Sequence, residues 1–391
     1  MIKYIHAQIE EIRRSRVLGL FGVFLALTHL VTWFFWGPWR SSFVKVLSER
    51  TAICWSYFPD CNALRPLSES FVSGLLYFYL FLGVATLVAV IAKKWRAFWW
   101  LLLIAVIVKW AMISLDYRFM GNYHYMPLVL SLVYLLVPSK KNLLPFFLIS
   151  FYVAAGLLKF TPEWYSGSTL LRPAFIQGKL LEWALVYVIY LELLFVWGLV
   201  SSKQWLRWIV FIQLVLFHIF SWHIVGFFYP TIMFCLLAFF PLLWLLPEKQ
   251  DSKSWPKAGV LALALFWCAQ MVPFIFYKNS AVSGEGRILS LNMLDAWTVC
   301  DATALVKMNK QQMLIPVKAK NFGVRIQCDP AVYIALLREE CEKWRKTDGF
   351  VDMDFDLQSM LRTETTASTV MSVRNACSRP PRLSILGSVV Q

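Results

Sequence analysis

Long apolar segments separated by short polar tracts dominate the first 277 residues of the chain. A helix needs roughly 20 mostly apolar residues to cross the hydrocarbon core of a bilayer. Nine segments come near that length, at residues 17–36, 71–92, 97–115, 124–138, 143–160, 181–200, 206–225, 227–246 and 258–277. The pattern therefore predicts an all-α polytopic membrane domain with nine transmembrane helices over residues 1–277.

The pattern changes in residues 278–391, where shorter apolar stretches alternate with turn signals. Asp329-Pro330 begins a helical pattern, with Asp329 as the expected N-cap. Residues 351–357 alternate apolar and acidic positions, which predicts a half-buried strand. We interpret its acidic side as a solvated face. A metal site is the alternative, although no histidine lies in this region. Residues 278–391 are expected to form a small α+β domain.

The charged residues predict which side of the membrane each loop faces. Lysines and arginines form short tracts at the N-terminus and in alternate loops, around residues 3–16, 93–96, 140–141, 203–207 and 249–257. Cytoplasmic loops are enriched in such residues. We therefore expect a cytoplasmic N-terminus and an extracytoplasmic C-terminal domain. The formal charge of +15 is explained by these tracts, so we expect the bilayer and no nucleic acid as a partner.

The eight cysteines separate by this topology. Cys235 and Cys268 lie within spans, where small core residues are expected. Six others lie in outer regions, where an oxidising compartment permits disulfides: Cys54, Cys61, Cys300, Cys328, Cys341 and Cys377. We expect Cys54–Cys61 as a local pair and leave the other pairings open. The chain has no N-x-Ser/Thr sequon, which favours a bacterial inner membrane and a periplasmic C-terminal domain over the endoplasmic reticulum and its lumen.

Ionisable residues within spans are costly and often functional. Those of this chain include His29, Lys109, Glu192, His218 and His223, with Lys159 at the end of the fifth span. Lys109 and His29 are interpreted as structural, with a carbonyl or an acid as the expected partner of Lys109. His218 and His223 are five residues apart and do not share a helix face, so we predict no metal site.

Lys159 is the leading candidate because its amine is either an interfacial anchor or a base held neutral near the membrane surface. Asn122, Tyr123 and His124 begin the fourth span at the same outer level. A direct pair between Lys159 and Glu192 is not expected, because Glu192 lies about 16 Å into a span that starts near residue 181, at 1.5 Å per residue. Glu163 and Glu182 are the expected partners by depth.

Two motifs resemble the vitamin K-dependent γ-glutamyl carboxylase family. Ala155-Gly156-Leu157-Leu158-Lys159-Phe160, followed by Glu163-Trp164, is similar to the family's Ala-Gly-x-Lys-Lys-Leu-Asp-x-Asp-Trp, whose second lysine falls on Lys159. His218 to Ser221 and Val225 to Pro230 resemble its His-x-x-x-Ser and Ile-Gly-x-Phe-Pro-Tyr segments, allowing one gap. The resemblance covers about residues 13–360 and is shared with the wider HTTM-domain group of bacterial membrane proteins.

The resemblance implies a chemistry. The family's lysine acts as a base on reduced vitamin K; oxygen then adds, and a glutamate side chain loses a proton and takes up CO2. By this resemblance the cofactor is a menaquinol-type quinol, with CO2 and O2 as co-substrates and no metal. A secreted peptide or protein is the partner, and Lys159, His124, Tyr123 and Asn122 are catalytic candidates. The candidates for binding quinone or substrate are His218, His223, Tyr229, Trp164 and Glu192.

One departure from the family concerns the start of the fourth span. The carboxylases have Asn-His there, whereas this chain has Asn122 and then Tyr123, with His124 one residue late. One residue turns a helix by about 100°, so His124 replaces the family's histidine only if the segment shifts. The outer region is also shorter than that of the carboxylases. A non-enzymatic HTTM protein for maturation, export or immunity of a secreted peptide is therefore the alternative, and a quinone-linked redox protein is the third.

Overall fold

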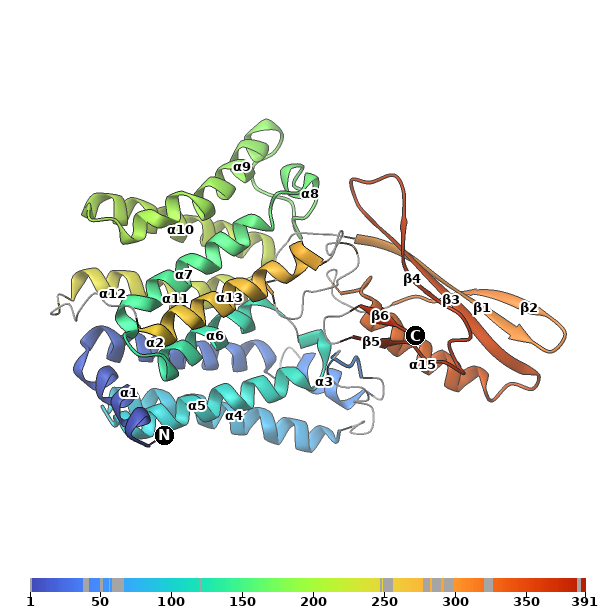
Figure 1. Cartoon of the computed structure of the whole chain (residues 1–391), viewed down its shortest axis with the longest axis horizontal. Coiled ribbons are helices and arrows are strands. Elements are labelled where there is room, and N and C mark those ends of the chain that lie inside the picture. The colour runs from blue at the N-terminus through green and yellow to red at the C-terminus, as the bar shows by residue number, and fades with distance from the viewer. Residues whose placement is uncertain are drawn as a thin grey trace.

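The computed structural model describes residues 2–37, 42–49, 52–55, 57, 67–119, 121–246, 248, 256–276, 282, 290–291, 298–319, 326–384 and 388–391. Within these ranges the chain forms a helical bundle and, at one end of it, a smaller domain with a sheet (Figure 1). The helical part up to Phe276 and the later sheet are the architecture that the apolar pattern predicts.

The bundle is built from helices that run mainly between the sheet domain and the opposite end (Figure 1). In chain order they are α1 (Ile2–Arg14), α2 (Arg16–Trp36), α3 (Ser42–Ser48), α4 (Glu69–Ile91), α5 (Trp95–Ser114), η2 (Tyr117–Phe119), α6 (Asn122–Leu136), α7 (Lys140–Leu157), α8 (Pro162–Tyr165), α9 (Lys179–Leu193), η3 (Phe195–Val200), α10 (Gln204–Val225), α11 (Phe228–Leu237), α12 (Phe239–Leu245) and α13 (Lys257–Phe276).

Six helices of the described chain are long and apolar enough to cross a bilayer: Arg16–Trp36, Glu69–Ile91, Trp95–Ser114, Gln204–Val225, Phe228–Leu245 and Lys257–Phe276. These six helices confirm the predicted class, an integral membrane protein. The other three predicted spans correspond to α6, α7 and α9. They are helical, but α6 and α9 have 15 residues each and α7 has 18, so nine spans stay a prediction.

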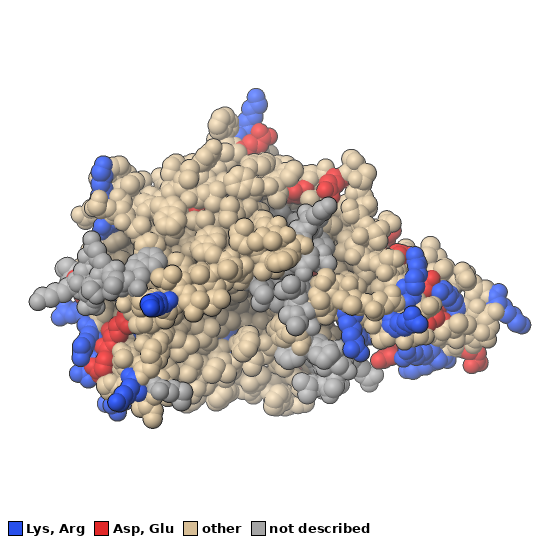
Figure 2. Space-filling view, in the orientation of Figure 1, with Lys and Arg blue, Asp and Glu red and all other residues tan. Residues whose placement is uncertain are grey.

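The basic tracts gather at the end of the bundle that lies away from the sheet domain. α1 and the turns before α5, α7 and α10 all lie there (Figure 1), and the space-filling view shows Lys and Arg at this end and on the sheet domain, with few on the flank between (Figure 2). α1 is fastened to this end, because Glu11 accepts hydrogen bonds from the backbone N–H groups of Ser139 and Lys140 at the start of α7. The charge pattern thus separates the two ends of the bundle.

The smaller domain is a four-stranded antiparallel sheet in the order β2-β1-β3-β4, with one helix packed against it. Its elements are β1 (Thr298–Met308), β2 (Gln312–Pro316), α15 (Pro330–Trp344), β3 (Phe350–Leu361) and β4 (Ser368–Val373), followed by the short pair β5 (Arg382–Leu383) and β6 (Val389–Val390). The predicted strand at residues 351–357 and the helix after Asp329 are both confirmed.

The acidic side of β3 differs from the expected solvated face. Asp352 and Asp354 are buried, because the segment after β4 covers them. Asp352 accepts hydrogen bonds from the Cys377 backbone and the Ser378 hydroxyl, and Asp354 accepts one from the Asn375 backbone. The interpretation was wrong because a strand pattern cannot show which later segment will cover a polar face.

Two disulfides hold the smaller domain, Cys300–Cys328 and Cys341–Cys377. The expected pair Cys54–Cys61 falls partly outside the described residues, since Cys61 is not among them. Cys235 is buried as expected, whereas Cys268 is exposed on α13, so its assignment to the core was wrong. An apolar residue of a membrane helix can face lipid as easily as protein, and the sequence does not separate the two.

The smaller domain contacts the bundle through apolar packing at the start of α15, where Val332 is buried in one cluster with Trp36, and through two side-chain hydrogen bonds. The Tyr117 hydroxyl donates to Asp329 Oδ2 over 3.0 Å, and Thr363 at the β3–β4 turn donates to the buried Glu163 of α8. Asp329 does occupy the N-cap position of α15, but its side chain makes no cap hydrogen bond. The carboxylate binds the bundle instead, so this residue joins two parts of the molecule.

Candidate functional site

Lys159 lies just beyond the end of α7 and is almost completely buried, with 1% of its surface exposed. Leu158 is the C-cap of α7 and stays in the helical region. This keeps the lysine beside the last turn, where Nζ lies 3.2 Å from the Ala155 carbonyl oxygen. The side chain therefore turns back along the helix and away from water, and the interfacial-anchor interpretation does not describe its position.

The partner of Lys159 is Glu192, with 2.5 Å between Nζ and Oε2. The sequence argument against this pair was wrong, because it took α9 to run beside α7 from its first residue. The first turns of α9 instead lie beside α8, where Trp164 Nε1 donates to the Leu185 carbonyl over 3.0 Å. Glu192 is thereby brought level with the last turn of α7.

Gly156 makes this approach of α7 and α9 possible. A Cβ atom at this position would lie 2.9 Å from Leu193 Cδ2 and 3.2 Å from Glu192 Cβ. The two expected partners of Lys159 lie elsewhere: Glu163 is bound by Thr363 and Glu182 is exposed. The glycine of the Ala-Gly segment thus has a packing role that sequence reasoning had not assigned to it.

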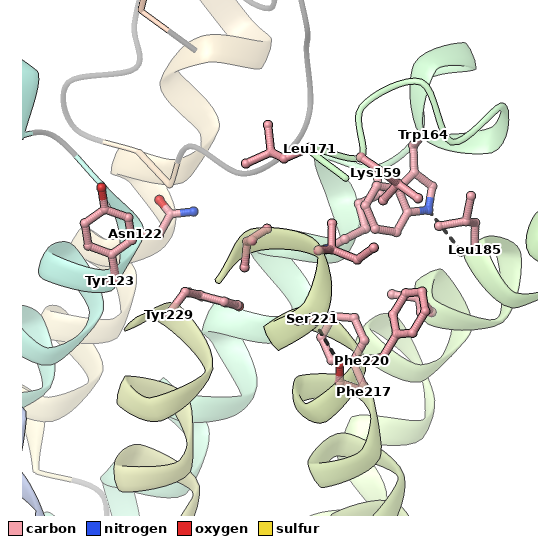
Figure 3. Close-up of a pocket in the computed structure, with 14 residues that line it drawn as sticks. Asn122, Tyr123, Lys159, Trp164, Leu171, Leu185, Phe217, Phe220, Ser221 and Tyr229 are labelled. Carbon is pink, nitrogen blue, oxygen red and sulfur yellow. Dashed lines mark hydrogen bonds between the residues drawn. The ribbon is translucent and has the colours of Figure 1, made fainter. Parts of the chain in front are cut away.

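A cavity of about 140 Å³ opens beside Lys159. Most of its lining is apolar, and the polar members come from several elements, among them α6, α10 and α11. It is lined by Asn122, Tyr123, Lys159, Trp164, Leu170, Leu171, Leu185, Val188, Phe217, Phe220, Ser221, Ile224, Val225 and Tyr229. Figure 3 shows Asn122 and Tyr123 on one side of it and Trp164 with Leu185 on the other. The arrangement suits a largely apolar ligand with a few polar atoms.

Trp164 covers the lysine. Its ring centroid lies 5.0 Å from Lys159 Nζ, within the range of a cation–π contact. α8 holds the ring there, since Thr161 caps this short helix by accepting a hydrogen bond from the Trp164 backbone. Trp164, predicted as a binding residue, therefore forms the wall of the cavity directly over the candidate base.

The start of α6 places Tyr123, and not His124, in the cavity. Gly121 permits this, because a Cβ there would lie 2.5 Å from the Tyr123 ring. His124 is buried on another side of the helix, with its ring 4.8 Å from that of Trp36 and 5.5 Å from that of Phe228. The structure therefore does not bring His124 to the cavity.

His218 lies behind the cavity, where its Nε2 is 2.7 Å from the hydroxyl of Tyr152. Its ring is 5.7 Å from that of Tyr229, which lines the cavity. Sequence reasoning missed Tyr152. The signal was present, because Tyr152 precedes Lys159 by seven residues, which is two helical turns and the same face. Of these three residues only Tyr229 lines the cavity, so His218, predicted as a binding residue, supports Tyr229 from behind and does not reach the cavity itself.

His223 does not reach the cavity. It is half-buried near the end of α10, where Nε2 lies 2.9 Å from the Pro173 carbonyl oxygen and the ring stacks on Phe175 at 3.7 Å between centroids. Its assignment as a cavity residue is therefore not supported by its position. The residue fastens the loop between α8 and α9 to α10.

A second buried cluster lies between α2, α4 and α5. Lys109 Nζ donates to the Thr32 hydroxyl over 3.0 Å, and His29 Nδ1 lies 2.8 Å from the Tyr79 hydroxyl. Lys109 therefore binds a hydroxyl, not the carbonyl or acid expected, and neither residue lines the cavity. Across the described chain no group of three or more His, Cys, Asp or Glu side chains could hold a metal ion.

Comparisons with protein-family models, with curated proteins and with solved structures find no match for this chain. The class that fold and site define is therefore an integral membrane protein with a buried Lys–Glu pair beside an apolar cavity.

Proposed function

We propose that the protein is a membrane enzyme similar to the vitamin K-dependent γ-glutamyl carboxylases, in which Lys159 is the base that acts on a reduced quinone. In this proposal α6, α7 and α9 complete nine spans, the N-terminus is cytoplasmic and the sheet domain is periplasmic. The modified group is a glutamate side chain of a secreted peptide or protein.

The observation that supports this proposal is the position of Lys159. A lysine in the wall of an apolar cavity is unusual, since burying a charged amine is costly. Its only polar partners among the described residues are the Glu192 carboxylate and the Ala155 carbonyl. Lys159 is also among the residues that line the cavity, with the Trp164 ring beside the amine.

The Lys159–Glu192 pair can hold one proton in two ways. With the proton on Glu192 Oε2, the amine is a free base and can take a proton from a hydroxyl in the cavity. The amine then holds the proton taken from the hydroxyl while Glu192 keeps its own. The pair returns to a single proton when the amine gives its proton to the water that forms as O2 is reduced.

The lining of the cavity supports a reduced quinone as the ligand. Trp164, Phe217 and Phe220 offer aromatic faces to a flat ring, and Asn122, Tyr123 and Tyr229 carry polar atoms suited to ring hydroxyls. When bound, a reduced quinone would supply an ionisable hydroxyl and the reducing equivalents for O2, leaving as its epoxide with one water while CO2 replaces a proton of the glutamate. Lys159 orients and deprotonates, while the apolar walls exclude water from the reacting groups.

A non-enzymatic role in the maturation, export or immunity of a secreted peptide is the second candidate. It is favoured by one observation: the Lys159–Glu192 contact is short and both side chains are buried, as in a structural ion pair. A redox protein that oxidises quinol without carboxylation is the third. All three place the site at the same cavity and differ in what happens there.

The deciding experiment is mass spectrometry of a Glu-containing secreted peptide co-expressed with the protein, with and without reduced vitamin K. We expect a mass gain of one CO2 on glutamate that depends on the quinol and disappears in Lys159→Ala at unchanged protein level. Lys203→Ala, which changes an exposed lysine at the other end of the bundle, is the matched control. Quinol oxidation without the mass gain would support the redox role, and full function of Lys159→Ala would exclude the base.

A further inference from the structure

The cavity beside Lys159 is walled largely by two consecutive helices. α9 contributes Leu185 and Val188, and α10 contributes Phe217, Phe220 and Ile224. η3 joins these two helices in the chain, and the cavity lies between them. Val188, Phe217 and Phe220 are only half-buried, and we call the part of the cavity that they line the gap.

The gap lies on a flank of the bundle that is suited to lipid. The large apolar side chains of α9 and α10 that face away from the bundle are exposed: Trp183, Tyr187, Tyr190, Leu216, Ile219 and Trp222. Contiguous exposed apolar surface on membrane helices contacts acyl chains. A molecule dissolved in the bilayer can therefore reach the gap without crossing water.

The outer side of the cavity is covered by the loop between α8 and α9. Leu170 and Leu171 of this loop line the cavity, and beyond them Pro173 and Phe175 are fastened to His223 of α10. The loop thus spans from α8 to α10 across the mouth of the cavity. We call residues 170–175 the strap.

The cavity has both polar and apolar lining. Polar atoms come from Lys159, Asn122, Tyr123, Ser221 and Tyr229, whereas the gap is lined by Val188, Phe217 and Phe220. This polarity matches an amphiphile with a small polar ring and one flexible hydrocarbon tail. A wholly apolar lipid would leave Lys159 and its neighbours without a polar partner in the cavity.

We propose that the cavity is filled from the bilayer, through the gap between α9 and α10, by an amphiphile whose ring lies against Lys159 and whose single tail stays in the gap. The strap closes the aqueous side. The proposal rests on the proposed function for the identity of the ring, and it adds the route of entry and the seat of the tail.

The test compares binding of an isoprenoid-tailed menaquinone and tail-less menadione to the full protein in lipid nanodiscs. Val188→Trp fills the gap, and Ile219→Trp, on the exposed face of α10 and outside the cavity lining, is the matched control. Overfilling a packed site costs 1–3 kcal/mol, so we expect Val188→Trp to weaken menaquinone binding roughly tenfold and to leave menadione binding unchanged. Ile219→Trp should bind both quinones as the wild type does, and equal thermal midpoints will show that both variants are folded.

Three results would overturn the proposal. Menaquinone binding that is unaffected by Val188→Trp would place the tail elsewhere while leaving the proposed function standing. Equal loss of both quinones in the folded variant would show that the gap is not a separate tail site. Failure of the wild type to bind either quinone would remove the proposed function as well.

Discussion

Lys159 and Glu192 place opposite charges in a setting from which water is excluded. Each charge offsets the cost of burying the other. A buried pair contributes little net stability, but removing one partner leaves an uncompensated charge, which typically costs 3–5 kcal/mol. Because both side chains are 1% exposed, solvent cannot rescue a single variant. The same contact thus makes the site sensitive to mutation whether or not the lysine is catalytic.

We predict strong coupling between Lys159→Met and Glu192→Leu. Each single change should lower the unfolding free energy by about 3 kcal/mol, and the double variant should lose clearly less than the sum. Denaturant unfolding in mixed micelles measures all four proteins. If the losses in unfolding free energy of the two single variants simply add in the double variant, the two side chains do not interact. Lys203→Met gives the baseline for an exposed lysine.

At the scale of single residues, the sequence identified most of the polar groups around the cavity but not how they combine. Asn122, Tyr123, Trp164 and Tyr229 were predicted and line it. His124 and His223 were predicted but do not line the cavity. His124 lies on another side of α6, and the ring of His223 is held by the loop between α8 and α9. The Lys159–Glu192 pair was missed. Counting residues along α9 gave the depth of Glu192 within that helix, but not the position of α9 relative to α7.

Among the elements, the strap has the most direct consequence. Ser221 lines the cavity and is nearly buried. In Ser221→Cys, a charged thiol reagent added from outside should label residue 221 slowly. Adding His223→Ala removes one hydrogen bond and one ring stack, together about 1–2 kcal/mol, and should speed labelling roughly tenfold.

Peptide mass spectrometry reads the labelling at residue 221 directly, so other thiols do not interfere. His6→Ala changes an exposed histidine of α1 at the far end of the bundle and should leave the rate unchanged. An unchanged rate in His223→Ala would show that the strap does not seal the cavity.

Strand β3 should make the sheet domain sensitive to acid. Burial alone would raise the pKa of Asp354, but hydrogen bonds from the Lys307 amine and the Asn375 backbone, with the charges of Lys307 and Arg374, lower it below its usual value. Its contribution to stability is therefore full above about pH 4, the unfolded value, and is lost as the pH falls through the lowered pKa.

Hydrogen exchange of β3 amides between pH 3 and 7, corrected for the intrinsic exchange rate, tests this. Protection in the wild type should drop at the acid end, and Asp354→Asn should be less protected at neutral pH and change less with pH. Asp301→Asn, on the exposed side of β1, is the control. If protection depends on pH in the same way in the wild type and in Asp354→Asn, then Lys307 and Arg374 do not stabilise the carboxylate.

Across the whole molecule, the apolar pattern and the charges predicted the division into a helical bundle and a sheet domain. Membrane helices must be long and apolar whether they face lipid or other helices, so the pattern reveals them in both cases. The pattern and the charges did not resolve whether α6, α7 and α9 span by themselves. These helices are the shorter ones, and α7 and α9 carry the site. Polar residues needed for a site lower the apolar signal from which spans are recognised.

The topology makes a prediction for the full chain. Nine spans place the two termini on opposite sides, so alkaline phosphatase, which needs an oxidising compartment to fold, should be active when fused after Gln391 in a bacterial host. The same fusion after Lys203, in an expected cytoplasmic loop, should be inactive. Activity in the second fusion and none in the first would reverse the orientation.

The Lys–Glu pair also bears on how the chain is made. Lys159 and Glu192 are 33 residues apart, so the ribosome delivers the lysine before its partner exists. A charged side chain buried among membrane helices is costly until it has a partner. α7 should therefore wait at the insertion machinery until α9 emerges, and the two should enter the membrane as a hairpin. Mutations that unbalance the pair would then lower the yield of inserted protein before they affect any reaction.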